Sequence, residues 1–156
     1  FNSDNPAASA NAVMLTVLSR LILLTGEQKY ATRARRLLRA FAAAVPRSFM
    51  AMAAYLNGAE TYSAALEVVV FGARGQAQTQ ELIRTVWGKA LPGRLLLVVE
   101  PGESLPPGHP AADVGMQNGQ PTVYICQGPQ RAGPIQSPVA LSQMLTLPPQ
   151  QRGTQP

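Results

Sequence analysis

The stretch Leu66-Glu67-Val68-Val69-Val70-Phe71-Gly72 divides the sequence into two parts of different periodicity. Before it, apolar residues recur at three- and four-residue steps, which is typical of helices. After it, they form short continuous runs, which are typical of strands buried on both faces. We therefore predict an α+β fold with helices over residues 1–64, a small α/β domain over 65–147 and a disordered polar tail over 148–156.

The α/β part contains three expected strands. A helix over about 76–87 separates the first two, so we expect a right-handed crossover and a parallel pair within a three-stranded, partly parallel sheet. A Pro- and Gly-rich loop over 101–120 is longer than compact domains usually contain, so it is either mobile or packed on partner structure. A short last helix follows Ser137. The expected strands are Leu66–Phe71, Leu95–Val99 and Pro121–Cys126.

The first 64 residues contain three expected helices of unlike character. The helix over about 9–25 is apolar almost all round and ends at Gly26. The second, from Glu27, is amphipathic, and the third, over about 47–56, is again apolar and is expected to stop at Asn57-Gly58. A double-layered helical toroid needs this alternation, whereas a simple bundle would show three amphipathic helices. We expect the two apolar helices to pack on protein that this chain does not contain.

Composition agrees with a piece of a larger assembly. Charged residues make up 13% of the chain, against about 25% in typical proteins. The chain opens with Phe1 rather than Met, so we expect that preceding residues were removed. Cys126 is the one cysteine, which excludes an internal disulfide. Arg20 interrupts the longest apolar run and no signal peptide is evident, so we expect a soluble, cytoplasmic protein with no membrane partner, metal or cofactor.

Most of the positive charge comes from arginine, and its densest cluster lies on the second expected helix. This cluster is either a nucleic-acid-binding patch or the solvated face of an amphipathic helix. No aromatic residues interleave with it and no nucleic-acid motif accompanies it, so we favour the solvated face and expect no nucleic-acid partner. The residues are Arg33, Arg35, Arg36 and Arg39.

Four polar residues at the start of the chain form the most suggestive binding group. As ligand-binding residues, they would lie at the mouth of a toroid cavity and hydrogen-bond a polyhydroxylated ligand. Alternatively they cap the first helix, because Ser, Asp and Asn are preferred N-caps, and we favour capping. The candidates are Asp4, Asn5, Ser9 and Asn11.

A turn over residues 72–75 lies between a strand and a helix, as phosphate-binding loops do, and Arg74 could assist an anion there. The turn matches neither common phosphate-loop motif, so we favour a plain strand-to-helix turn. No two acidic residues have the spacing of a catalytic pair, and catalytic residues therefore stay unassigned. We interpret Trp87, Met50 and Met52 as core packing residues.

Two further side chains could carry chemistry. Cys126 ends an expected strand, and Arg131 is the one nearby cation that could activate its thiol. We interpret Cys126 as a buried apolar thiol. His109 lies in the long loop, far in sequence from any paired acid, and we expect it to be solvated.

Several segments, taken in order, resemble one family. Asp4-Asn5 with Ser9 and Asn11 resembles a D-N-x-x-P-S-G-N-S stretch, and Leu24-Thr25-Gly26 with Tyr30 and Ala34 resembles an L-T-G-x-x-x-Y-x-x-x-A turn. Glu67-Val68-Val69-Val70 with Gly72 resembles an E-V-V-I-x-G strand, and Thr122-Val123-Tyr124-Ile125-Cys126 with Pro134 resembles a T-A-Y-V-C strand and its sequel. From Asp4 to about Leu147, the chain is similar to the C-terminal region of thioredoxin-domain proteins of the YyaL and spermatogenesis-associated type.

This resemblance implies an N-terminal thioredoxin-like domain, then an (α/α) toroid similar to that of N-acylglucosamine 2-epimerases and six-hairpin glycosidases, then a small α/β end. The present chain would hold only the last toroid helices and that end. It departs from the pattern at residues 8–12, which lack the Pro and Gly, and at Arg131, where the family often has a second cysteine.

We therefore predict a structural and assembly role for a C-terminal segment of such a protein. Its partners would be the rest of its own parent protein, or a second copy joined through apolar helices. The alternative is part of a carbohydrate-processing enzyme, epimerase- or glycosidase-like, whose main catalytic residues lie in the missing portion. Under that alternative, Asp4, Asn5 and Asn11 would complete a sugar site. Nucleic-acid binding ranks third.

Overall fold

The computed structural model describes residues 7–91, 93–128 and 130–147. It mixes helices with one sheet, which confirms the predicted α+β class. The chain divides into two compact units, Phe1–Ala65 and Leu66–Pro156. The predicted disordered tail, 148–156, lies outside the described residues. Within the described ranges, no helix combines the length and the apolar character that a membrane crossing needs.

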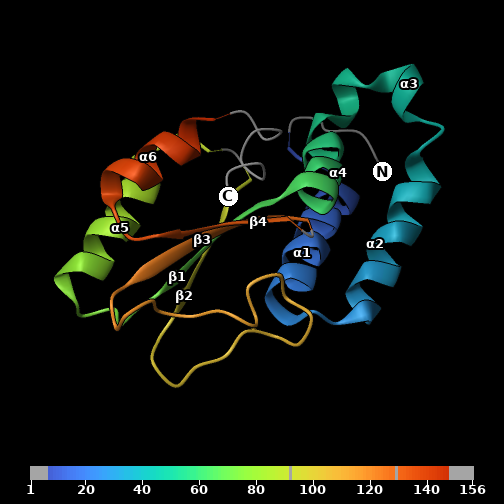
Figure 1. Ribbon diagram of the computed structural model, residues 1–156. Helices are drawn as coiled ribbons and strands as arrows, with labels where there is room; N and C mark the ends of the chain where they lie inside the picture. Colours follow the sequence, from blue (N-terminus) through green and yellow to red (C-terminus); the bar gives the residue numbers. More distant parts are fainter. Residues whose placement is uncertain (1–6, 92, 129, 148–156) are drawn as a thin grey trace. The chain divides into compact units, whose positions relative to one another are not determined.

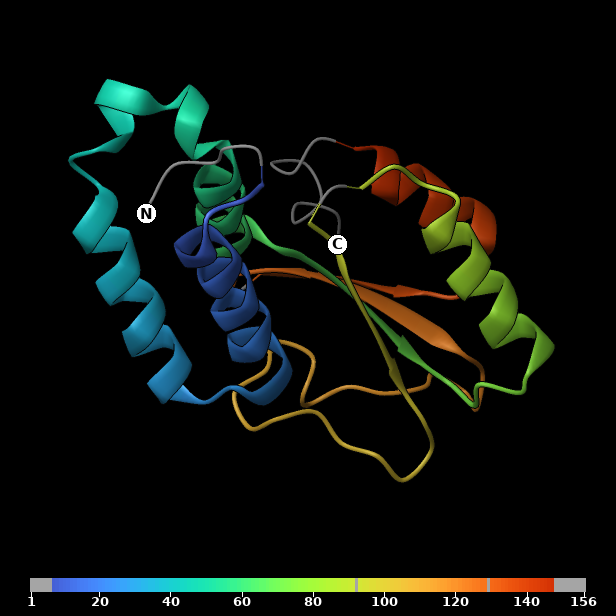
Figure 2. The ribbon, with the colours of Figure 1, turned by 180° about the vertical axis from the view of Figure 1, so that it is seen from behind.

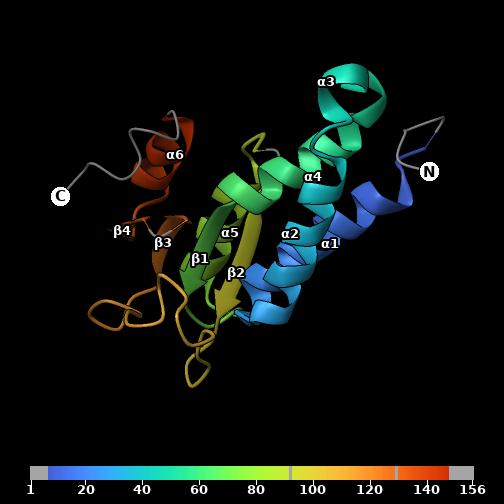
Figure 3. The ribbon, with the colours of Figure 1, turned by 90° about the vertical axis from the view of Figure 1, so that its right-hand side faces the viewer.

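The first unit is helical, and its central helix α1 packs against both α2 and α4 (Figures 1 and 3). Its core consists of Ala12, Leu15, Leu18, Ala34, Met52 and Tyr55. The hydroxyl of Tyr55 donates a hydrogen bond of 2.9 Å to the carbonyl of Leu38, which ties α4 to α2. The elements are α1 (Ala10–Thr25), α2 (Gln28–Phe41), α3 (Val45–Ser48), a 3-10 turn η1 (Met50–Met52) and α4 (Ala53–Ala64).

The first helix begins and ends where the sequence predicts, and the second begins where it predicts. Ser9 is the N-cap of α1, and its C-cap Gly26 has a φ of 67°, the left-handed conformation that glycine adopts without strain. Glu27 is the N-cap of α2. Local capping chemistry therefore decided both boundaries of α1.

The prediction for the third helix is wrong in two respects. The segment is broken into α3, η1 and α4, and α4 continues through Gly58 instead of stopping there. A Cβ at Gly58 would lie 3.2 Å from the Leu15 side chain of α1, so this glycine permits close helix packing rather than a helix end. Of the two methionines predicted as core residues, Met52 is buried, with 2% of its surface exposed, whereas Met50 is 76% exposed.

The second unit contains a four-stranded sheet in the order β2-β1-β3-β4 (Figure 1). β1 pairs with β2 in parallel, as predicted, and with β3 antiparallel; β3 pairs antiparallel with β4. The prediction of three strands missed β4. The strands are β1 (Leu66–Phe71), β2 (Leu95–Val99), β3 (Thr122–Gln127) and β4 (Gln130–Ile135).

The two faces of the sheet are covered differently (Figures 1 and 2). Helices α5 (Ala77–Trp87) and α6 (Pro138–Thr146) lie side by side on one face, over a core that includes Val68, Val70, Leu82, Val86 and Leu141. On the other face, the long loop over 100–121 covers the sheet, and its Ala111 joins a second core with Val69, Phe71, Tyr124 and Cys126. The loop therefore packs on the sheet of its own unit.

Candidate functional site

The polar group at the start of α1 is only partly described. Ser9 is 6% exposed, and its hydroxyl accepts a hydrogen bond of 3.3 Å from the main-chain N–H of Ala12. It therefore caps the helix, which is the interpretation that the sequence favoured. Asn11 is half-buried in the first turn, and Asp4 and Asn5 lie outside the described residues. A ligand-binding role for these residues stays a prediction.

A buried side-chain contact joins the long loop to the sheet. His109 Nε2 lies 2.7 Å from Glu67 Oε2, and the two side chains are 4% and 5% exposed. The expectation of a solvated His109 is therefore wrong. The partners are 42 residues apart in sequence, and neither local pattern nor composition indicates their pairing.

The second ring nitrogen fixes the tautomer of His109. Its Nδ1 accepts a hydrogen bond of 3.0 Å from the main-chain N–H of Ala111. An accepting ring nitrogen carries no proton, so the single N–H of the neutral imidazole is at Nε2 and donates to Glu67. Both ring nitrogens are therefore engaged, one by the loop itself and one by the sheet.

Cys126 lies on the same face of the sheet as this pair. It is directly opposite Glu67 on β1 and opposite Arg131 on β4. Burial, reinforced by the nearby negative charge of Glu67, raises the pKa of the thiol from 9.0 to about 12, although Arg131 acts in the opposite direction. With 1% of its surface exposed, Cys126 is the buried apolar thiol that the sequence predicts.

The cysteine, histidine and glutamate thus come together without forming an activated nucleophile. A general base for Cys126 would need a free nitrogen lone pair, and the lone pair of His109 at Nδ1 is already bound. The raised pKa keeps the thiol protonated near neutral pH. We conclude that these residues fasten the loop to the sheet.

Other polar contacts hold the same loop. Arg131 Nη1 donates to the carbonyl of Pro110 at 2.6 Å and also pairs with the carboxylate of Asp113. This hydrogen bond from Arg131 lowers the pKa of Asp113. The hydroxyl of Tyr124 donates to the carbonyl of Gly115 at 3.3 Å. In the described part of the chain, no three His, Cys, Asp or Glu side chains gather as metal ligands would.

The 72–75 turn joins β1 to α5 as a plain strand-to-helix connection. A Cβ at Gly72 would meet the hydroxyl of Thr79 at 2.6 Å, so glycine is required for close packing against the helix. Arg74 Nε forms an ion pair of 3.2 Å with Glu100, and its Nη2 donates to the carbonyl of Val98 at 3.4 Å. Arg74 is therefore directed toward the edge of β2.

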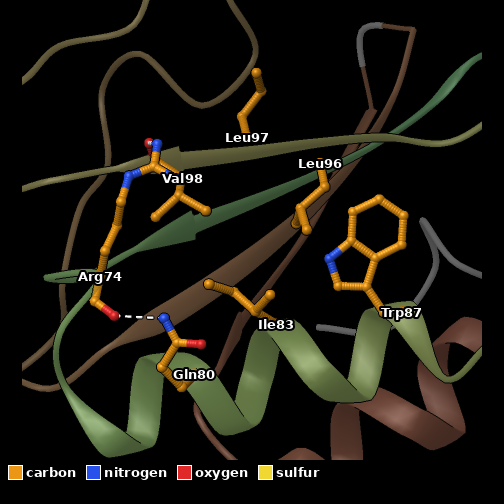
Figure 4. A pocket seen from close by; sticks show the side chains of 7 residues that line it. All are labelled: Arg74, Gln80, Ile83, Trp87, Leu96, Leu97 and Val98. Atoms are coloured by element: carbon orange, nitrogen blue, oxygen red, sulfur yellow. Dashed lines mark hydrogen bonds between the residues drawn. The ribbon is translucent and has the colours of Figure 1, made fainter.

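Beside that edge lies a hollow of about 400 Å³, which we call the β2–α5 groove. Figure 4 shows Arg74 at one end and Trp87 at the other, with Ile83 of α5 facing Leu96 of β2 between them. Trp87 is 61% exposed and stacks against Arg94, 4.4 Å from the ring centre, so it is not the core residue that the sequence predicted. The lining residues are Arg74, Gln80, Ile83, Trp87, Leu96, Leu97 and Val98.

Comparison with known proteins gives no assignment of this site. No protein-family model matches the chain, and no curated protein or solved structure matches it. The resemblance to the thioredoxin-domain proteins stays a prediction, as do the toroid and the cytoplasmic location.

Proposed function

We propose that this chain has a structural and assembly role, and that its first unit joins other protein through one face of α1. Four large apolar side chains of this helix, which we call the α1 stripe, are between 44% and 51% exposed. They are Val13, Met14, Val17 and Leu24.

The α1 stripe has the spacing of a helix-packing surface. Val13, Val17 and Leu24 are four and seven residues apart, which places them along one side of a helix. The opposite side already packs inside the unit through Leu15 and Leu18. Apolar side chains grouped on an exposed face indicate an interaction surface rather than random exposure.

The composition of the stripe indicates the kind of partner. Arg20 lies between Val17 and Leu24 on the same side of the helix. A partner helix with an apolar seam and one carboxylate would cover the valines and neutralise the arginine. The partner that we propose is therefore an amphipathic helical segment, either of the parent protein or of a second copy.

Light scattering and binding of an anilinonaphthalene dye to the full chain test this role. We expect self-association, dye binding or both, and we expect the double variant Val13→Lys/Val17→Lys to reduce them without changing the helical circular dichroism. The variant Thr32→Lys/Ala40→Lys adds the same charge at exposed positions of α2 and should behave as the unsubstituted chain does. A monomer that binds no dye would overturn the proposal.

A further inference from the structure

The outer edge of β2 presents free positions for another strand. Gly72 donates a main-chain hydrogen bond of 3.0 Å to the carbonyl of Val99, so Val99 turns its main chain toward β1. Because successive residues of a strand alternate, Leu97 also faces β1, whereas Leu96 and Val98 direct their main-chain groups outward. No strand of the described chain pairs with that side.

The sequence of β2 lacks the features that usually protect such an edge. Proteins protect exposed edges with charged residues, proline or bulges. Leu95-Leu96-Leu97-Val98-Val99 contains no charge and no proline, and the first four of these residues are only half-buried. Arg74 reaches over one end of the edge through its bond to the carbonyl of Val98. The remaining edge is suited to pairing with an extended segment.

The β2–α5 groove runs beside this edge and can accept side chains of the added strand. In a strand paired to β2, alternate side chains would point to the α5 side of the sheet. There they would meet Ile83, Leu96 and the exposed ring of Trp87 (Figure 4). Main-chain bonds to the edge would supply affinity, and the apolar hollow would select the side chain.

The charge at the Trp87 end indicates an acidic partner. The guanidinium of Arg94 stacks on Trp87, and its Nη1 donates to the carbonyl of Lys89 at 2.8 Å. None of the ion pairs among the described residues involves Arg94. Arg74, at the other end, shares its charge with Glu100. A carboxylate of the incoming peptide would therefore pair with the guanidinium of Arg94.

We propose that the β2–α5 groove binds an extended acidic peptide segment of a protein partner by strand addition to β2. The segment pairs its main chain with Leu96 and with the N–H of Val98, places one apolar side chain against Ile83 and Trp87, and places a carboxylate on Arg94. This site lies in the second unit and is independent of the α1 stripe.

Fluorescence anisotropy with the full chain tests the proposal. The probe is a labelled nonapeptide of alternating valine and threonine that ends in two glutamates. A second probe ends in two lysines. Two further probes are versions of the acidic peptide in which the main-chain nitrogens of one edge, or of the opposite edge, are methylated. We expect the acidic peptide to bind at least tenfold more tightly than the basic one, and methylation of one edge to abolish its binding.

Variants of the protein locate the binding. Val98→Pro removes an outward N–H that is not part of the ladder to β1, so we expect a loss of tenfold or more. Arg94→Glu should reverse the preference between the acidic and the basic peptide, while Arg36→Glu makes the same charge change on exposed α2 and should leave binding unaltered.

Several results would overturn strand addition. Equal binding of both methylated peptides, or full binding by Val98→Pro, would show that the main-chain edge is not used. If the unsubstituted chain forms a dimer and the Val98→Pro variant does not, the edge pairs with a second copy instead. Absence of binding up to millimolar acidic peptide would exclude the proposed partner.

Discussion

The buried contact between His109 and Glu67 gives the most demanding stability prediction. The variant His109→Ala removes the imidazole whose Nε2 lies 2.7 Å from the carboxylate, in a pair whose side chains are 4% and 5% exposed. Deleting the neutral imidazole leaves the Glu67 carboxylate buried without its donor, which costs about 3 kcal/mol, the upper end of the usual range, because the group left behind is charged. Since small domains are stable by only about 5–15 kcal/mol, this change should remove about a fifth or more of the total.

The variant Glu67→Gln provides the matched comparison. A glutamine has nearly the same shape, and its side-chain oxygen can still accept the proton of Nε2. The change replaces a hydrogen bond to a charged group, worth about 1.5–3 kcal/mol, with a neutral one worth about 0.5–1.5 kcal/mol. We therefore expect Glu67→Gln to cost only about 1 kcal/mol, well below the cost of His109→Ala.

Urea unfolding followed by Trp87 fluorescence is the appropriate assay. Trp87 is the single tryptophan and lies in the second unit, so its signal reports the unit that contains the pair. A cost below about 1 kcal/mol for His109→Ala would refute the reasoning, since an unpaired buried carboxylate cannot be that inexpensive. Equal costs for the two variants would refute the claim that the imidazole N–H is the donor.

Three further predictions address packing and the thiol. Gly72→Ala should lower the free energy of unfolding by about 1–3 kcal/mol, because its Cβ would meet Thr79 Oγ1 at 2.6 Å, whereas Gly75→Ala, with open space around it, should change it little in the same urea titration. Leu82→Ala should cost about 2–5 kcal/mol in that titration, because Leu82 is fully buried between α5 and the sheet. Cys126 should react with Ellman's reagent at pH 8 only as the chain unfolds. Because folding raises its pKa from 9.0 to about 12, its contribution to stability is complete below pH 9 and is lost as the pH rises toward 12, and fast labelling of the native chain would contradict this.

The missed strand shows one limit of prediction from sequence. Residues 130–135 read Gln-Arg-Ala-Gly-Pro-Ile, with polar residues, a glycine and a proline that argue against a strand. β4 nevertheless forms because it lies at the edge of the sheet and pairs along β3. An edge strand needs only one partner, so its hydrogen-bonded neighbour can override its own weak propensity.

The candidate sites show a second limit. The cap at Ser9 and the inert character of Cys126 followed from the residue types and their local positions. The contact between His109 and Glu67 and the exposure of Trp87 did not, because each depends on which distant segment lies opposite. The 72–75 turn was predicted as a turn, but its role in bringing Arg74 to the edge of β2 required the sheet order.

The amino-acid sequence alone determined the α+β class, the boundaries of α1 and the parallel pairing of β1 with β2, because capping residues and apolar periodicity act over a few neighbouring positions. Tertiary structure alone decided that α4 continues through Gly58, that His109 is buried against Glu67, and that no described strand pairs with the outer side of β2. These features arise from contacts between residues far apart in the chain, and no local pattern specifies which surfaces will meet.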